Sequence, residues 1–316
     1  MATQAAELVF DEATKQYPDR PEPAVDRLSL TVPAGEICVL VGPSGGGKTT
    51  ALKLVNRLIP LTSGDIRIDG RSINDQDVTE LRRSIGYVIQ QVGLFPHMTV
   101  EANIGTVPRL YGRSRQWIRE RTAELLELVG LDPSYAKRYP AQLSGGQRQR
   151  VGLARALAAN PPLMLMDEPY SAIDPIVRAR LQDEFLRLQR ELRKTVLFVT
   201  HDIDEAIKVG DRIAILREGG RLAQYDTPEN ILLKPADEFV AQFVGADRAL
   251  KALSLRTLGQ ISLRPGTWLD GLPQIDASTN LRDALGFLLA GGSDRAIVVD
   301  DDGNPLGTVT PEDIVR

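Results

Sequence analysis

The chain has 316 residues, 42% of them hydrophobic, which is enough to bury the core of one large domain and leave a smaller second unit. Its 38 Lys and Arg residues are balanced by 42 Asp and Glu residues, giving a net charge of -4 at pH 7. Because the two signs are mixed along the chain, there is no basic stripe for a phosphate backbone, and we expect no nucleic-acid partner. The one cysteine, Cys38, excludes a disulfide framework and stands in an apolar run typical of a buried strand.

The N-terminus has neither the basic start nor the apolar stretch of a signal peptide. No window of the sequence approaches the roughly 18 apolar residues that a membrane-spanning helix requires. We therefore expect the chain to stay in the cytoplasm, where any contact with a membrane is made through a protein partner.

Strand-length apolar runs alternate with helical patterns through the larger part of the chain. The runs are rich in Val, Ile and Leu without polar alternation, which is typical of parallel strands covered on both faces, and they span residues 37–41, 163–166, 196–199 and 213–216. Helical patterns supply the crossovers that parallel strands require, at residues 49–58, 116–129, 147–159 and 178–192. Residues from about 95 to 155 contain no strong strand and are predicted to form a mainly helical insert between two halves of an α/β sheet.

The pattern changes after Gly245. Residues 246–271 are predicted to be a polar connector, and residues 272–316 follow a β-α-β-β-α order, with a strand at 297–299 and a turn at 300–304. We therefore predict three parts, namely a large domain over residues 1–245, the connector, and a small α+β module.

A glycine-rich loop follows the first predicted strand. Its sequence, GPSGGGKT at residues 42–49, fits the phosphate-binding pattern G-x-x-x-x-G-K-[ST] and has the strand before it and the helix after it that the pattern needs. Glycines let backbone N–H groups surround phosphate oxygens, and the helix N-terminus adds a partial positive charge. We predict that Lys48 holds the β- and γ-phosphates of a nucleotide and that Thr49 is a magnesium ligand. The predicted nucleotide contacts of the loop are Gly42, Pro43, Ser44, Gly45, Gly46, Gly47, Lys48, Thr49 and Thr50.

Two acids and a histidine follow other predicted strands. Asp167 and Glu168 end the second strand, and ligands of open parallel sheets bind outside the carboxyl ends of the strands. We predict that Asp167 holds magnesium, directly or through water, and that Glu168 is the general base for an attacking water. His201 directly follows a further apolar strand and is predicted to contact the γ-phosphate, whereas His97 is expected to be a surface or packing residue.

A second anion site is predicted at the start of another helix. The sequence LSGGQ at residues 143–147 places a serine and two glycines where the helix begins, and such an N-terminus attracts anions. The segment has no lysine or acid of its own. It makes chemical sense if it closes over a nucleotide that another copy of the chain holds.

These motifs, together with Gln90 and the SAID sequence at residues 171–174, resemble in order and spacing the Walker A, Q-loop, signature, Walker B, D-loop and H-loop motifs of ABC (ATP-binding cassette) ATPases, over about residues 7–245. The resemblance implies an α/β P-loop NTPase fold with a mainly parallel core sheet, an antiparallel β subdomain and a helical subdomain. It also implies hydrolysis of ATP with Mg2+ by a head-to-tail homodimer in which one copy completes the ATP site of the other. The residues expected to act in trans are Ser144, Gly145, Gly146, Gln147 and Asp174.

The resemblance implies roles for two further residues. Tyr17, in the segment KQYP at residues 15–18, matches the aromatic residue that stacks on adenine, and the alternative is a loop tyrosine with only a packing role. Gln90 matches the residue that contacts magnesium and reports its presence to the membrane subunit. Residues 91–98 are then expected to line the groove that receives a coupling helix of an integral membrane permease.

The segments between the motifs narrow the resemblance. Residues 85–97, 225–229 and 239–245 look like the subfamily that imports quaternary amines and related osmoprotectants, whose cargo includes glycine betaine, choline, carnitine and proline. Such a chain works at the cytoplasmic face of the plasma membrane, bound to permease subunits that receive cargo from an extracytoplasmic substrate-binding protein. Importers of amino acids, sulfonates or inorganic anions are the nearer alternative, and a non-transport ABC ATPase is the more remote one.

The sequence GTVTPED at residues 307–313 resembles the end of a CBS (cystathionine β-synthase-type) module. In such modules a hydroxyl residue and an aspartate can grip a ribose, which points to Thr310 and Asp313 as regulatory residues. Only one copy is visible, whereas these modules normally occur in pairs, so we expect two copies to pair across the homodimer. The alternative is a degenerate tail that only helps dimerisation.

Overall fold

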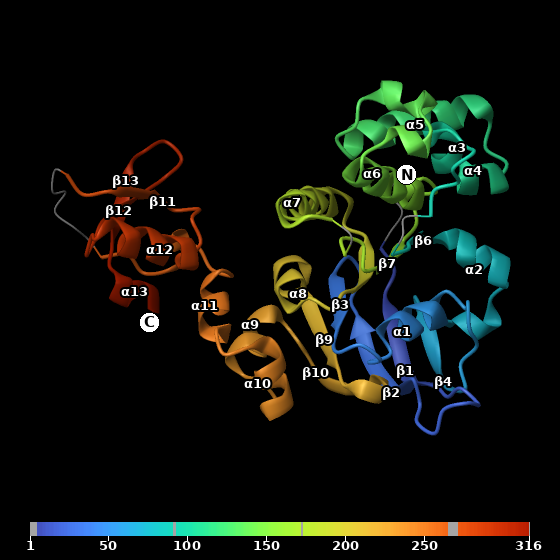
Figure 1. Ribbon diagram of the computed structural model, residues 1–316, viewed down its shortest axis with the longest axis horizontal. Helices are drawn as coiled ribbons and strands as arrows, with labels where there is room; N and C mark the ends of the chain where they lie inside the picture. The colour runs from blue at the N-terminus through green and yellow to red at the C-terminus, as the bar shows by residue number, and fades with distance from the viewer. Residues whose placement is uncertain (1–4, 91–92, 172, 265–270, 316) are drawn as a thin grey trace. The chain divides into compact units, whose positions relative to one another are not determined.

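The computed structural model describes residues 5–90, 93–171, 173–264 and 271–315. By its internal contacts the chain divides into two units, Met1–Thr227 and Pro228–Arg316 (Figure 1). Within the described ranges, no helix combines the length and the apolar composition needed to cross a membrane.

A mainly parallel sheet forms the centre of the first unit. Its strands are β3 (Ile37–Val41), β6 (Ile85–Val88), β7 (Leu163–Asp167), β8 (Thr195–Val199), β9 (Arg212–Leu216) and β10 (Leu222–Asp226). Among the described residues the order is β10-β9-β3-β8-β7-β6, and only the edge pair of β9 and β10 is antiparallel. Every residue of β3, β7 and β8 is buried, as expected for apolar runs without polar alternation. The four predicted strands are confirmed, and β6 and β10 are additions to them.

A second, antiparallel sheet has the strand order β2-β1-β4-β5. Its strands are β1 (Leu8–Lys15), β2 (Val25–Val32), β4 (Ser63–Ile68) and β5 (Arg71–Ser72). Along β2 the residues from Leu28 onward alternate between buried and exposed, so that one face of the sheet is covered and the other meets solvent. This is the antiparallel β subdomain that the family resemblance implies.

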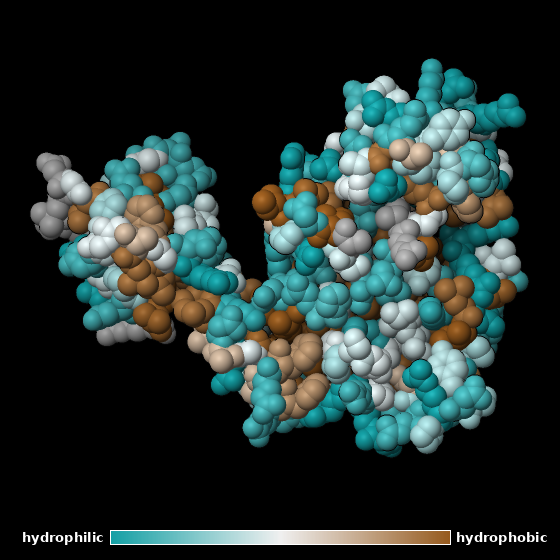
Figure 2. Space-filling model, in the orientation of Figure 1, coloured by the Kyte–Doolittle hydropathy of each residue, from teal (hydrophilic) through white to brown (hydrophobic). Residues whose placement is uncertain are grey.

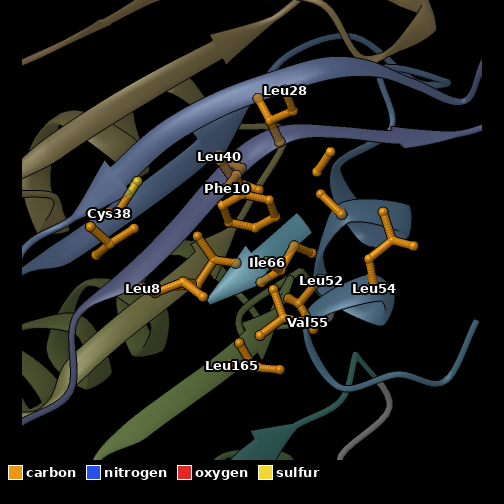
Figure 3. Close-up of a cluster of buried hydrophobic side chains, with 14 of the residues drawn as sticks. Leu8, Phe10, Leu28, Cys38, Leu40, Leu52, Leu54, Val55, Ile66 and Leu165 are labelled. Atoms are coloured by element: carbon orange, nitrogen blue, oxygen red, sulfur yellow. The ribbon is translucent and has the colours of Figure 1, made fainter. Parts of the chain in front are cut away.

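A hydrophobic core lies between these two sheets and includes helix α1 (Lys48–Val55) (Figure 3). Phe10 from β1 and Ile66 from β4 lie close to Leu52 and Val55 of the helix, with Leu165 of β7 below them. Burying each such side chain stabilises the fold by about 1.5–3 kcal/mol. Because α1 is anchored in this core, the loop that joins β3 to α1 is fixed at both ends.

Helices cover the central sheet and fill the interval between β6 and β7. That interval contains α3 (Val100–Ile104), α4 (Thr106–Leu110), α5 (Arg115–Leu128) and α6 (Gly145–Leu157), which gather together in Figure 1. The other helices of this unit are α2 (Val78–Ser84), α7 (Pro175–Leu192) and α8 (Ile203–Val209). The four predicted helices correspond to α1, α5, α6 and α7. The regular structure described between β6 and β7 consists of helices, and the bounds of the predicted insert, about residues 95–155, stay a prediction.

The second unit begins with three short helices, α9 (Pro228–Leu233), α10 (Glu238–Val244) and α11 (Arg248–Leu253). Helix α9 packs against both α10 and α11. The unit therefore starts upstream of Gly245, where the sequence places the end of the large domain. The functional boundaries after residues 245 and 271 stay predictions.

The remainder of this unit follows the predicted β-α-β-β-α order. Its elements are β11 (Gln274–Asp276), α12 (Leu281–Gly291), β12 (Ala296–Val299), β13 (Pro305–Val309) and α13 (Pro311–Val315). Asp300 closes the predicted turn, because its carboxylate accepts hydrogen bonds from the backbone N–H groups of Asp302 (3.0 Å) and Asn304 (2.7 Å). Figure 2 shows hydrophobic residues gathered on the face of this unit over α12 and α13, where Phe287, Leu289 and Val315 are 47%, 67% and 63% exposed.

Candidate nucleotide site

The glycine-rich loop connects the end of β3 to the start of α1. Gly47 has φ of 76°, and a Cβ atom there would lie 2.2 Å from the carbonyl oxygen of Ala24. A Cβ atom on Gly42 would lie equally close, at 2.2 Å, to the carbonyl oxygen of Leu216. Only glycine fits these two positions, so the loop can pass tightly between its neighbours and leave its backbone N–H groups for a ligand.

Lys48 is the first residue of α1, and its side chain is turned back over the loop. Its Nζ donates hydrogen bonds to the carbonyl oxygens of Gly42 and Pro43, both at 2.8 Å. Burial lowers the pKa of this ammonium group, while the negative charges of Glu168 and Asp167 act in the opposite direction. The loop carbonyls thus hold a cation next to the space that the predicted phosphates would occupy.

Thr49 and Asp167 meet beneath the loop. The Thr49 hydroxyl donates a hydrogen bond of 2.9 Å to Oδ1 of Asp167, the last residue of β7. Burial raises the pKa of Asp167 and the charge of Glu168 adds to this, while the bond from Thr49 acts in the opposite direction. A hydroxyl and a carboxylate are the hard oxygen ligands that Mg2+ prefers, so the donor set fits this ion.

Glu168, Gln90 and His201 are brought together by three neighbouring strands. Glu168 directly follows β7 and has φ of 44°, a left-handed conformation that is uncommon for a residue with a side chain. Its Oε2 accepts a hydrogen bond of 2.9 Å from Nε2 of Gln90, beyond the end of β6. Its Oε1 lies 3.2 Å from Nδ1 of His201, beyond the end of β8. The candidate general base is therefore held by an amide on one oxygen and an imidazole on the other.

A pocket of about 760 Å³ opens in front of these groups. Its lining contains most of the predicted nucleotide residues, and it also contains three that the sequence reasoning missed, Asp19, Arg20 and Ala24. Gly42, Pro43 and Asp167 lie behind the lining, where they contact Lys48 and Thr49. The full lining is Tyr17, Asp19, Arg20, Ala24, Ser44, Gly45, Gly46, Gly47, Lys48, Thr49, Thr50, Gln90, Glu168 and His201.

Tyr17 lines this pocket from the segment between β1 and β2. The Lys15 ammonium lies 5.1 Å from the centroid of its ring, a cation–π distance. Tyr17 was the sequence signal that could have led to Asp19 and Arg20, because these residues share its short connecting segment.

The predicted in-trans residues do not line the pocket of their own chain. Ser144 caps the N-terminus of α6, where its hydroxyl accepts a bond from the Gln147 N–H (3.2 Å) and Oε1 of Gln147 accepts one from the Ser144 N–H (2.9 Å). Asp174 caps α7 with its carboxylate, which accepts from the N–H groups of Ile176 and Val177. The positions of Ser144, Gly145, Gly146, Gln147 and Asp174 are described, and none of them is among the lining residues.

Some predicted residues lie away from this pocket or outside the described ranges. His97 is exposed, with its ring centroid 6.2 Å from that of Phe95. Gln91 and Val92, predicted to begin the coupling groove, and Ala172 of the predicted D-loop lie outside the described residues.

In the second unit, Thr310 and Asp313 contact each other. Oδ2 of Asp313 accepts bonds from the backbone N–H (3.0 Å) and the hydroxyl (2.7 Å) of Thr310. Its other oxygen accepts two bonds from Arg264, at 2.9 and 2.7 Å, a partner that the sequence reasoning missed. Burial would raise the pKa of Asp313, but the bonds from Arg264 and Thr310 outweigh it and hold the pKa below its usual range.

Comparison with known proteins identifies both parts of the chain. The ABC transporter family model matches residues 25–171, and the CBS domain model matches residues 270–316. The osmoprotectant import ATP-binding protein OsmV of Salmonella typhimurium is 50% identical over 308 residues, which cover 96% of this chain and 78% of that protein. The chain belongs to the ATP-binding subunits of ABC transporters.

Other ABC relatives agree with this assignment. The choline transport ATP-binding protein OpuBA of Bacillus subtilis is 48% identical, covering 96% of this chain and 78% of that protein. The dimeric structure of the bacterial ABC transporter cassette MJ0796 superposes with a TM-score of 0.63 at 36% identity, covering 70% of this chain and 98% of that one. A post-hydrolysis state of the same cassette, bound to ADP and phosphate, matches equally well. This ABC subunit is accordingly an ATPase that carries a C-terminal CBS domain.

Proposed function

We propose that this chain energises an ABC importer of quaternary-amine osmoprotectants such as glycine betaine, choline, carnitine or proline. The observation that carries the ATPase chemistry is the single pocket in which Lys48, Glu168 and His201 converge. The cargo class is supported by relatives at 48–50% identity whose names refer to osmoprotectant import and choline transport.

The proposed chemistry divides the work among the pocket residues. Lys48 and the loop N–H groups bind the ATP phosphates, and Tyr17 stacks on the adenine. Glu168 accepts a proton from the attacking water, which a carboxylate within hydrogen-bonding reach can do. His201 steadies Glu168 through the 3.2 Å contact and also faces the γ-phosphate. Mg2+, held by Thr49, Gln90 and Asp167, supplies positive charge against the phosphates when bound.

The active form is proposed to be a head-to-tail homodimer at the cytoplasmic face of the plasma membrane. Support comes from Ser144 to Gln147, which lie at the N-terminus of α6, where anions are attracted, and do not line the pocket of their own chain. In the dimer these residues and Asp174 would close the partner's ATP site. The dimer would attach to integral membrane permease subunits, which receive cargo from an extracytoplasmic substrate-binding protein.

For the CBS domain we propose a regulatory role centred on Thr310 and Asp313, with the domains of two copies paired. The exposed apolar residues over α12 and α13 support pairing, because such a face is otherwise left in water. Asp313 accepts hydrogen bonds from Arg264 and from Thr310, so a ribose hydroxyl would compete with these donors for its carboxylate.

The test is uptake of labelled glycine betaine, choline, carnitine and proline at high osmolarity, in cells with the intact chain, without it, or with Glu168→Gln. The variant should bind ATP but lose at least about 100-fold in turnover, a barrier increase of about 2.7 kcal/mol, and uptake should fall with it. Glu191→Gln, an exposed position on α7, is the matched control and should leave uptake unchanged. Unchanged uptake of all four compounds in cells lacking the chain would overturn the cargo class and leave the ATPase assignment in place.

A further inference from the structure

A buried polar contact joins α7 to α8 behind the His201 loop. Glu205, in the first turn of α8, is only 6% exposed, and Gln182 of α7 is 5% exposed. The Gln182 Nε2 donates a hydrogen bond of 2.9 Å to Oε1 of Glu205. Burying a carboxylate is unfavourable unless its oxygens are hydrogen-bonded, so this pair must retain its partners for the helices to stay in place.

The Glu205 carboxylate also holds Thr200 directly, and through Thr200 it holds Asp202. The Thr200 hydroxyl hydrogen bonds to the Glu205 carboxylate. The hydroxyl oxygen of Thr200 also accepts a hydrogen bond of 3.0 Å from the Asp202 N–H. Thr200 precedes His201 in the chain, and Asp202 follows it. One buried carboxylate therefore restrains the backbone on the two sides of the histidine.

His201 depends on this restraint because its own side chain is 59% exposed. A largely exposed imidazole is not held by packing, yet it lies 3.2 Å from Oε1 of Glu168. The direction of the side chain must then come from the backbone that carries it. A misplacement of about 1 Å at a reacting group can lower turnover by about 100-fold.

A second contact joins the same loop to the region before α7. Arg178 of α7 lies 3.5 Å from the Asp202 carboxylate and donates a bond of 3.1 Å to the carbonyl oxygen of Ile173. Ile173 directly precedes Asp174, the cap of α7. The His201 loop is thus tied to α7 at two successive turns of that helix, through Arg178 and Gln182.

We propose that Glu205 is a positioning residue for ATP hydrolysis, which holds His201 against Glu168 through its hydrogen bonds to Thr200 and Gln182. This inference rests on the roles proposed above for Glu168 and His201. Glu205 acts by accepting hydrogen bonds from Thr200 and Gln182. Turnover should therefore depend more on the number of acceptor oxygens at position 205 than on the size of the side chain.

The first experiment exchanges the donor and the acceptor in the full-length chain. Glu205→Gln leaves one acceptor oxygen for the two donors Gln182 and Thr200, and Gln182→Glu places two carboxylates against each other. We expect each single variant to lower kcat about tenfold with little change in the KM for ATP. The double variant restores one donor and one acceptor and should recover kcat to within about threefold of wild type. Melting temperatures are measured beside the rates. A double variant that melts like wild type but stays as slow as the single variants contradicts the proposal.

Thr200→Val provides a second route that keeps the shape of the side chain and removes only its hydroxyl. It should lower kcat in the same way as Glu205→Gln. Lys208→Ala is the matched control, because it removes the exposed α7–α8 contact between Lys208 and Asp183 and should leave kcat unchanged. An equal loss in the Lys208 variant would show a general effect of helix packing and would overturn the positioning role.

A cycle with His201→Ala separates this inference from the proposed mechanism. If His201→Ala has lost turnover, adding Glu205→Gln should lower single-turnover hydrolysis no further, because the group being positioned is already gone. Additive losses would overturn the inference and leave the role of His201 intact. Normal turnover in His201→Ala alone would instead overturn the role of His201, and the inference with it.

Discussion

The Ala24 carbonyl oxygen faces Gly47 across a gap that leaves no room for a side chain. The phosphate loop is thus shaped partly by a residue of the β1–β2 connection, more than twenty positions earlier in the sequence. Gly45 has a similar backbone conformation, with φ of 83°, but a Cβ atom there would meet nothing within 4 Å. A side chain at Gly47 would meet both a steric clash and backbone strain, whereas one at Gly45 would meet backbone strain alone.

We predict that Gly47→Ala weakens ATP binding by at least about tenfold, equivalent to about 1.4 kcal/mol, because the new Cβ displaces either the loop or Ala24. Gly45→Ala carries only the backbone strain and should lose less. Equilibrium titration with a fluorescent ATP analogue gives both dissociation constants. Equal losses in the two variants would show that strain, not the Ala24 contact, shapes the loop.

Residues placed by a strand and the loop that follows it could be predicted from the sequence, whereas residues brought close by strand pairing elsewhere in the chain could not. Asp167 ends β7, His201 follows shortly after β8, and Lys48 follows β3 after the glycine-rich loop, so the parallel sheet predicts that all three lie at one edge. Asp19 and Arg20 reach the pocket only because β1 pairs with β2. No local pattern marks that pairing, and its register is interrupted by bulges.

The serine that begins helix α6 has two roles in the proposed dimer. Ser144 caps the helix within its own chain, and it is also proposed to bind phosphate in the partner's site. The two tasks make different demands on the side chain, because a cap needs an oxygen acceptor while a phosphate site tolerates no negative charge.

Substitution can therefore separate these tasks. Ser144→Ala should lose about 1 kcal/mol of stability with the cap. Ser144→Asp keeps an acceptor and should melt close to wild type, yet its charge should repel ATP phosphates and lower kcat well below that of wild type. Thermal unfolding and ATPase assays on the same samples compare the two effects. If ATPase activity falls only where the melting temperature falls, Ser144 is a helix cap and nothing more.

Continuous apolar runs predicted β3, β7, β8 and β9, but the same reasoning did not find β6. Gly86 and Tyr87 interrupt its apolar run, and only its position beside β7 completes the strand. Helices α3 and α4, each with five residues, are too short to show a helical period. The second unit likewise includes α9 because of its packing against α11, which no sequence boundary marks.

The proposed dimer makes each ATP site from two chains. The pocket contains Lys48 but not Ser144, although both residues are described. A homodimer with Lys48→Ala in both copies loses both sites, and so does one with Ser144→Asp in both copies. In a mixed dimer one copy carries Lys48→Ala and the other carries Ser144→Asp. Both substitutions then fall in the same ATP site, and the other site has neither.

We predict that mixing the two inactive variants restores ATPase activity, up to about half of the wild-type rate per mixed dimer if the sites act independently. Steady-state hydrolysis is measured as the mixing ratio is varied, with each variant mixed with itself as the control. The rate should peak near equal amounts of the two variants. A mixture that stays inactive at every ratio would contradict the two-chain site.

Cys38 lies fully buried in β3, and burial raises the pKa of its thiol to about 12. A protonated, shielded thiol does not react with maleimides at neutral pH, since the thiolate is the reactive form. The native chain can therefore accept an engineered cysteine without removal of its own. Placed at Ile176, which is 84% exposed, such a residue would carry a spin label beside the cap of α7. Label-to-label distances would then follow two copies through a cycle of turnover.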